Sequence, residues 1–148
     1  MNIKTMIIAG IATLAAVAFF LQFSAKDTAD RTLPRQDERL ISALIAVESN
    51  GNDYAVGDNG RSAGCLQINK CVVDDVNRVC GTAYSYADRF NREKSKEIFR
   101  HYMGIYATSK RLKRTVTNED RARIWNGGPN GYVKAATKQY WRRVKNRM

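Results

Sequence analysis

The stretch LISALIAVESNGNDYAVGDNGRSAGCLQIN, residues 40–69, decides the fold of this chain. Its first part has apolar residues at three- and four-residue spacing, which predicts an amphipathic helix over residues 36–49. Its second part predicts a small β-hairpin over residues 54–69, because Asp58-Asn59-Gly60 supplies a turn between two short extended runs. We therefore expect a helix followed directly by a hairpin.

Four further helices are expected after the hairpin. A valine pattern over residues 72–79 indicates the second helix, and apolar spacing over about residues 91–107 indicates the third. Thr117 followed by Asp120 is typical of a helix-starting capping box, and that short helix should end at Trp125. A terminal helix is outlined by Val133, Ala136, Tyr140, Trp141 and Val144. The fold class is therefore mainly α (α+β), with one small hairpin.

Length and charge restrict the class of protein. A chain of 148 residues fits one globular domain, and 25 Lys and Arg against 14 Asp and Glu give a net charge of +11. Such a charge favours anionic partners such as nucleic acid, acidic lipid or cell wall. No nucleic-acid-reading motif is visible, so no nucleic-acid partner is expected.

Three cysteines are too few for a disulfide scaffold, and none has the histidine partners of a zinc site. We expect no metal and no cofactor. In a mature domain outside the cytoplasm, a single bridge would join two of the three thiols, and Cys71 with Cys80 is the preferred pair.

The N-terminus carries an almost unbroken apolar run from Met6 to Phe23. This run indicates a signal anchor or signal peptide over residues 1–25, and the bulky Phe23 three positions before a cut at Ala25 favours an uncleaved anchor. The polar segment 26–35, which contains Pro34, is expected to be a linker. The folded domain is then residues 36–148.

Glu48 and Asp58 are the residues in this stretch that suggest chemistry. Glu48 shares the inward stripe of Leu44 and Ile41 at the end of its helix, so its carboxyl should be partly buried and its pKa raised. Asp58 lies in the polar turn of the hairpin and should stay ionised. A protonated acid facing an ionised carboxylate is the arrangement that glycoside hydrolysis uses. Asp53 is the weaker substitute for the second carboxylate.

Several motifs resemble the invertebrate-type (destabilase) lysozymes over about residues 40–145. The matching segments are Val47-Glu48-Ser49, the Asp58 turn, Gly64 to Ile68, the run EDRARIWNGGPNG at residues 119–131, and the later Thr137, Tyr140-Trp141 and Val144. The front half is equally similar to soluble lytic transglycosylases of bacteria and phages. Both resemblances imply a lysozyme-like fold. The chain departs from the invertebrate-type pattern in its few cysteines and in Trp125, where that family usually has His.

The resemblance implies roles for individual residues. Glu48 corresponds to the general acid of both groups, and Asp58 to the second carboxylate that only the lysozymes use. The sugar-binding walls would be formed by Ser49, Gln67, Ile68, Asn126, Gly127, Gly128, Pro129 and Tyr132. Trp125 and Tyr140 are further aromatic residues that could stack on sugar faces.

The function expected from this resemblance is a peptidoglycan-cleaving muramidase, a lysozyme acting on the bond between N-acetylmuramic acid and N-acetylglucosamine. One alternative is a lytic transglycosylase in which Glu48 acts alone. The other is an inactive basic module that binds cell wall or nucleic acid. The expected partners are peptidoglycan glycan strands and, through the N-terminal helix, the membrane. A monomer is expected, anchored in the inner membrane and facing the periplasm or cell wall, or secreted if the signal is cleaved.

Overall fold

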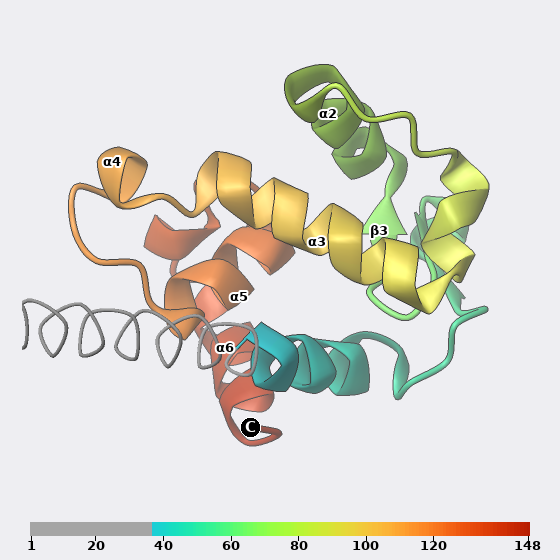
Figure 1. The fold of residues 1–148 in the computed structure, drawn as a ribbon. Coiled ribbons are helices and arrows are strands. Elements are labelled where there is room, and N and C mark those ends of the chain that lie inside the picture. The colour runs from blue at the N-terminus through green and yellow to red at the C-terminus, as the bar shows by residue number, and fades with distance from the viewer. Residues whose placement is uncertain (1–36) are drawn as a thin grey trace, which may run out of the picture. The chain divides into compact units, whose positions relative to one another are not determined.

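The computed structural model describes residues 37–148, and its compact unit runs from Arg39 to Met148 (Figure 1). The expected anchor at residues 1–25 and linker at residues 26–35 lie outside the described residues. Among residues 37–148, no helix has both the length and the apolar character needed to cross a bilayer.

The first helix of the described chain runs through residues 37–49, as the apolar periodicity predicts. Its inward stripe is fully buried, with Leu40, Ile41 and Leu44 each 0% exposed. Burying three large aliphatic side chains contributes on the order of 5 kcal/mol of transfer free energy, which fixes this helix against the rest of the domain. Its last residues, Glu48 and Ser49, are only partly buried.

The predicted hairpin is part of a three-stranded antiparallel sheet. Its strands are β1 (Val56–Gly57), β2 (Ser62–Ala63) and β3 (Ile68–Asn69), in the order β1-β2-β3. The 3-10 turn η1 (Asp58–Gly60) joins β1 to β2 with positive φ angles of 49°, 55° and 86° at its three residues. Asp, Asn and Gly are the residues that adopt this left-handed conformation most readily. The turn prediction is therefore confirmed, and the third strand is an addition to it.

Helices follow the sheet along the chain. α2 (Lys70–Cys80) begins with the Asn69 side chain as its cap and ends at Gly81, whose φ is 67°. The 3-10 helix η2 (Tyr86–Phe90) leads into α3 (Arg92–Tyr106), which is followed by the short α4 (Ser109–Leu112). α2 and α3 confirm the two helices expected from the apolar spacing.

The C-terminal part contains α5 (Asn118–Gly127), η3 (Gly131–Val133) and α6 (Thr137–Lys145). The capping box at the start of α5 is confirmed, because the Thr117 hydroxyl accepts from the Asp120 N–H and the Asp120 carboxylate accepts from the Thr117 N–H. The terminal helix begins later than its apolar pattern suggests, since Val133 belongs to the separate turn η3.

One apolar core joins these elements. It contains residues of the first helix, of β2 and β3 and the segment between them, of α2, α3, α5 and α6, and Leu112. The domain is therefore mainly helical with a small three-stranded sheet, which confirms the expected fold class at this level.

The three cysteines are free thiols. Cys71 and Cys80 lie near opposite ends of α2, where nine residues of helical rise separate them by about 13 Å. A disulfide needs Cα atoms within about 7 Å, so the expected pairing of these two residues is wrong. Cys65 is fully buried in the core.

Candidate functional site

A polar cleft of about 310 Å³ opens beside the end of the first helix. The sheet, the start of α2 and the end of α5 form its other walls. Its lining residues are Glu48, Asp58, Ser62, Gln67, Asn69, Val72, Trp125 and Asn126. The cleft is thus built from segments that are far apart in the sequence, and it contains both carboxyl groups that the sequence singled out.

Glu48 is held at the cleft by the last helix. Its carboxylate accepts a hydrogen bond of 2.6 Å from the hydroxyl of Tyr140 in α6. Burial raises the pKa of Glu48, while the Tyr140 hydrogen bond and the positive charge of Arg143 act in the lowering direction and the negative charge of Asp58 adds to the raising one. Desolvation is the largest of these effects, so the pKa stays above its ordinary value, as predicted.

Asp58 enters the cleft from the turn η1. Its carboxylate accepts a hydrogen bond of 2.8 Å from the Ser62 hydroxyl at the start of β2. The left-handed backbone of Asp58 and Asn59 aims this side chain across the turn. By contrast Asp53, the substitute for the second carboxylate, does not line the cleft and forms an ion pair with Arg92.

Two of the predicted ligand-contacting residues, Gln67 and Asn126, line the cleft. The Gln67 amide donates to the backbone carbonyls of Ala55 and Gly64, at 3.2 and 3.0 Å, so its side chain ties together the segments that flank the sheet. Asn126 lies in the last turn of α5 and presents its amide at the opposite wall. Amides on two walls provide both donors and acceptors for a polar ligand.

The remaining members of the predicted set do not line the cleft. Ser49 donates to the carbonyl of Cys65 at 2.9 Å, and Ile68 is fully buried. Pro129 lies on a different pocket, beside α2 and Tyr102. The guanidinium carbon of Arg111 lies over the Tyr132 ring, 5.6 Å from the ring centroid. Neither Gly127 nor Gly128 is among the cleft residues.

Packing accounts for two glycines of the N-G-G-P-N-G run. A Cβ on Gly131 would stand 1.9 Å from the carbonyl oxygen of Arg123, and a Cβ on Gly127 would stand 2.6 Å from the side chain of Thr137. These glycines let α5, η3 and α6 approach one another closely. This part of the motif therefore reports the fold of the C-terminal region and does not by itself indicate a sugar ligand.

The sequence pattern missed several residues of the site. Ser62, Asn69 and Val72 line the cleft, yet no motif marks them. Tyr140 is buried in the core, and its hydroxyl donates to Glu48, which lies 92 residues earlier in the sequence; no motif marks this contact. The one signal for Tyr140 is its place in the inward stripe of α6, which places it in the interior without naming its partner.

Trp125 forms a rigid wall of the cleft. Its indole N–H donates to the Leu66 carbonyl at 3.2 Å, and its ring meets Phe99 and Tyr102 edge-on at centroid distances of 5.1 and 5.8 Å. An aromatic side chain fixed on several sides holds its position without a ligand.

As for metals, no cluster of three His, Cys, Asp or Glu that could hold an ion occurs within residues 37–148.

Fold and site together define a class: a small, mainly helical domain whose cleft contains a buried carboxyl and a second carboxylate on a turn. No family model matches the chain, and no curated protein matches it. Among solved structures, the chain is similar to a chain in the crystal structure of Aeromonas hydrophila PliI in complex with Meretrix lusoria lysozyme. The identity is 28%, the match covers 73% of this chain and 87% of that chain, and the TM-score is 0.62.

This finding corrects the functional predictions made from the sequence. The matched structure is a complex of two proteins, PliI and a lysozyme, so this chain is similar to a chain of a protein–protein complex. Together with the lack of any matching family model, it does not support membership of the invertebrate-type lysozyme or lytic transglycosylase families. The assignments as a muramidase, as a transglycosylase and as an inactive wall- or nucleic-acid-binding module are therefore withdrawn.

The predicted partners change in the same way. The matched structure is a complex between proteins, so the predictions of peptidoglycan glycan strands and of a membrane bound through the N-terminal helix as partners are withdrawn. The motif resemblance misled because the fold itself demands part of it: Gly127 and Gly131 are dictated by packing, and Ile68 by burial in the core.

Proposed function

We propose that this domain has a lysozyme-like fold and forms a protein complex of the kind that PliI and Meretrix lusoria lysozyme form, with its cleft in the interface. The observation that carries the proposal is the structural similarity, which extends over 87% of the matched chain at 28% identity. A likeness over nearly the whole of a chain concerns the arrangement of all its elements, including those that build the cleft.

The cleft has properties that suit an interface. It is concave and polar, and its acidic side chains lie in a chain whose net charge is +11. A protruding segment of a partner would meet the amides of Gln67 and Asn126 and the carboxyl groups of Glu48 and Asp58. Polar groups that are desolvated in such a pocket contribute specificity when the partner satisfies them. The roles of Glu48 as proton donor and Asp58 as second carboxylate stay predictions.

A binding experiment with both proteins of the matched complex tests the proposal. The full chain is mixed with purified Aeromonas hydrophila PliI and, separately, with Meretrix lusoria lysozyme, and each mixture is examined by size-exclusion chromatography and calorimetry. We expect a stoichiometric complex with one of the two, and the identity of that partner decides which side of the complex this chain represents. If neither protein binds, the proposal is wrong.

Two substitutions test whether the cleft lies in the interface. Asn126→Arg puts a long side chain into the cleft, whereas Val79→Arg adds the same charge at an exposed position two turns further along α2 that does not line the cleft. We expect the first to weaken the complex by about tenfold or more and the second to leave the affinity nearly unchanged, as for central and peripheral interface positions. Equal losses would remove the cleft from the interface.

We further propose that the domain works outside the cytoplasm, with residues 1–25 as a signal or anchor and residues 26–35 as a tether. The apolar run from Met6 to Phe23 supports this placement. Protease added to spheroplasts should then degrade the domain of the full chain. Complete protection in intact spheroplasts, with degradation after lysis, would contradict it.

A further inference from the structure

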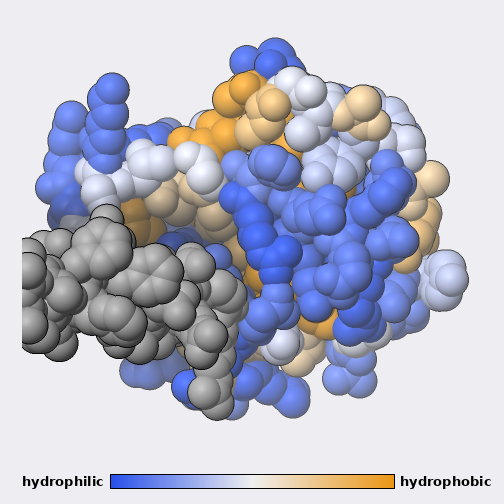
Figure 2. All heavy atoms as spheres, viewed as in Figure 1, coloured by the Kyte–Doolittle hydropathy of each residue, from blue (hydrophilic) through white to orange (hydrophobic). Residues whose placement is uncertain are grey.

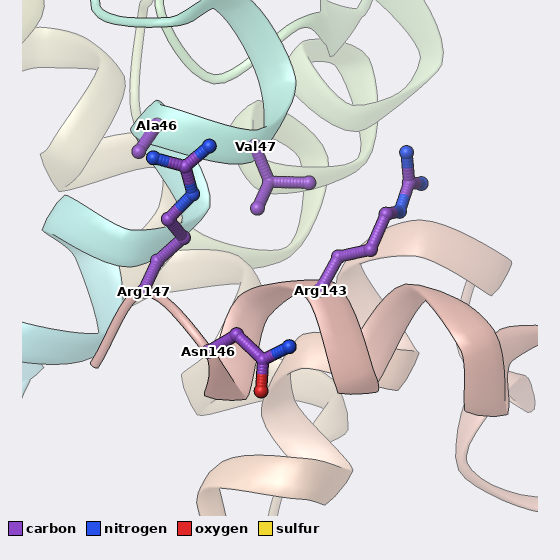
Figure 3. Close-up of a pocket in the computed structure, with 5 residues that line it drawn as sticks. All are labelled: Ala46, Val47, Arg143, Asn146 and Arg147. Carbon is purple, nitrogen blue, oxygen red and sulfur yellow. The ribbon is translucent and has the colours of Figure 1, made fainter.

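A second pocket, of about 430 Å³, lies between the end of the first helix and the end of α6 (Figure 3). It is lined by Ala46, Val47, Arg143, Asn146 and Arg147. This pocket shares no lining residue with the cleft. Figure 3 shows the two arginine side chains extending from the C-terminal segment toward the first helix, with Val47 between their guanidinium groups.

The charged side chains that line this pocket are both positive. Two arginines and an amide line it together with two apolar side chains, and no aspartate or glutamate is present in its wall. Within residues 37–148, neither Arg143 nor Arg147 makes an ion pair. Other arginines of the same domain are paired, for example Arg92 with Asp53 at 2.9 Å. The pocket wall is thus positive, and the nearest acidic group that interacts with it is Glu48, beside Val47, through Arg143.

Both arginines extend toward the same pocket from the end of the C-terminal segment. Arg143 lies in α6, and Arg147 lies in the turn that follows it, where its N–H donates to the Val144 carbonyl at 2.9 Å. Arg143 is also located by its own helix, because its guanidinium lies over the ring of Tyr140 at 5.6 Å. The guanidinium forks on the two sides of Val47 offer more donors than a carboxylate can accept, whereas a tetrahedral oxyanion can accept from both.

We propose that Arg143 and Arg147, with Asn146, form a binding site for a phosphate group. The Asn146 amide would add a donor to the forks of the two arginines, and the apolar wall of Ala46 and Val47 would limit access of water from one side. The ligand is a phosphomonoester or phosphodiester, either free in solution or carried by a lipid headgroup. This site is independent of the protein complex proposed above.

The first test is a titration of the full chain with inorganic phosphate at constant ionic strength. The side-chain Nε–Hε signals of Arg143 and Arg147 are followed by NMR. We expect a saturable shift of both signals, which the double variant Arg143→Gln, Arg147→Gln should abolish. Shifts that rise without saturation would overturn the proposal, because they report general screening.

Lys138 and Arg142 provide a matched control on the same helix. They are also basic, exposed and four residues apart, but neither lines the pocket. Replacing both with Gln removes the same charge, so we expect phosphate affinity to fall by less than about twofold, against about tenfold or more for the pocket pair. Equal losses in the two double variants would show that net charge alone attracts the anion and would overturn the site.

Glu48 supplies a second readout. Because the charge of Arg143 acts to lower the pKa of Glu48, a phosphate bound to Arg143 should raise that pKa. The pKa is measured from the side-chain carboxyl ¹³C signal with and without saturating phosphate. An unchanged pKa would place the anion away from Arg143 and contradict the proposal.

Vesicles distinguish the two sources of phosphate once the ion is found to bind. The full chain and its two double variants are sedimented with vesicles of phosphatidylcholine containing phosphatidylglycerol, using the same vesicles for each. A loss of sedimentation confined to the Arg143, Arg147 variant supports the site with a lipid headgroup as ligand. Sedimentation with phosphatidylcholine alone, which the proposed anchor would cause in all three proteins, is subtracted, and an equal remainder in all three supports a soluble phosphate compound as the ligand of the same site.

Discussion

Opposing effects act on the pKa of the Glu48 carboxyl: burial raises it, and the Tyr140 hydrogen bond and the Arg143 charge lower it. Their net effect can be measured. Burial raises the pKa of Glu48, so between the ordinary pKa and the raised one the folded chain binds a proton that the unfolded chain does not. The free energy of unfolding contributed by this group therefore falls as the pH rises through that window. The Tyr140 hydrogen bond limits the loss by favouring the ionised form.

Replacing Glu48 with Gln should remove this pH dependence. We expect the stability of the variant relative to the wild type to increase as the pH rises from about 4, the ordinary Glu value, because Gln carries no charge to desolvate. Urea unfolding at a series of pH values measures the difference. Glu97→Gln is the control, since Glu97 also accepts a hydrogen bond from a tyrosine, Tyr84, but at the exposed surface. Parallel curves for wild type and Glu48→Gln would contradict the prediction.

Tyr140→Phe should raise the pKa of Glu48 further. The substitution removes the hydroxyl that donates to the carboxylate and leaves the ring in the core. A lost hydrogen bond to the charged form disfavours that form, so the carboxyl ¹³C titration of Glu48 should move to higher pH. The Glu97 signal of the same sample serves as the internal control. A shift of Glu48 to lower pH would show that the hydroxyl does not favour the carboxylate.

At the scale of single residues, the sequence predicted which side chains lie at the cleft only where the local helix or turn determines their position. The placement of Glu48 follows from helical periodicity, and that of Asp58 from turn chemistry, so both could be found from neighbouring residues. Tyr140 and Ser62 reach the site through contacts that depend on the packed fold. Ser49 and Ile68 do not line the cleft, because a motif match cannot distinguish a side chain that faces a ligand from one that supports the wall.

Among the elements, the junction of α5, η3 and α6 has tight steric limits. Gly131→Ala would bring a Cβ to 1.9 Å from the Arg123 carbonyl oxygen, which is backbone and cannot rotate away. We expect a loss of about 2–3 kcal/mol in unfolding free energy, typical of forced overpacking. Denaturant unfolding monitored by circular dichroism measures it.

Gly104→Ala is the matched control, because it lies inside α3 and its new Cβ would meet nothing within 4 Å. There the same substitution should stabilise the domain by up to about 1 kcal/mol, through helix propensity. If both variants lose the same stability, the close approach at Gly131 does not limit packing.

The helices were predictable because their apolar stripes repeat over several turns, whereas the strands were not. β1, β2 and β3 have two residues each, too few for alternation to appear, and β3 runs straight into α2. What marks the sheet in the sequence is its turns, where Asp58, Asn59 and Gln67 adopt positive φ angles. Turn chemistry reveals one hairpin, but the third strand depends on tertiary packing.

Across the whole domain, the three cysteine thiols differ in how deeply they are buried. Cys71 and Cys80 are exposed, whereas Cys65 is buried and burial raises the pKa of its thiol. In the native protein a thiol reagent should modify two cysteines rapidly and the third only when the core opens. Mass spectrometry of labelled peptides over time measures this. Rapid labelling of Cys65 in native buffer would show that the core around it opens easily.

A Cys71→Ser, Cys80→Ser variant provides the control, since it keeps the buried thiol alone. Its labelling rate should increase with urea as the domain unfolds, and its unfolding midpoint should equal that of the wild type because both replaced side chains are exposed.

The face seen in Figure 2 is predominantly hydrophilic, consistent with a core enclosed by polar residues on that side.

The bond between Glu48 and Tyr140 also has a consequence for how the protein is made. Tyr140 lies in α6, 92 residues after Glu48, so a polypeptide that has been synthesised only as far as α5 lacks the partner of Glu48 until α6 emerges. Until then the wall that buries Glu48 is incomplete. The cleft acquires its chemical character only after α6 has been made and has packed against the first helix.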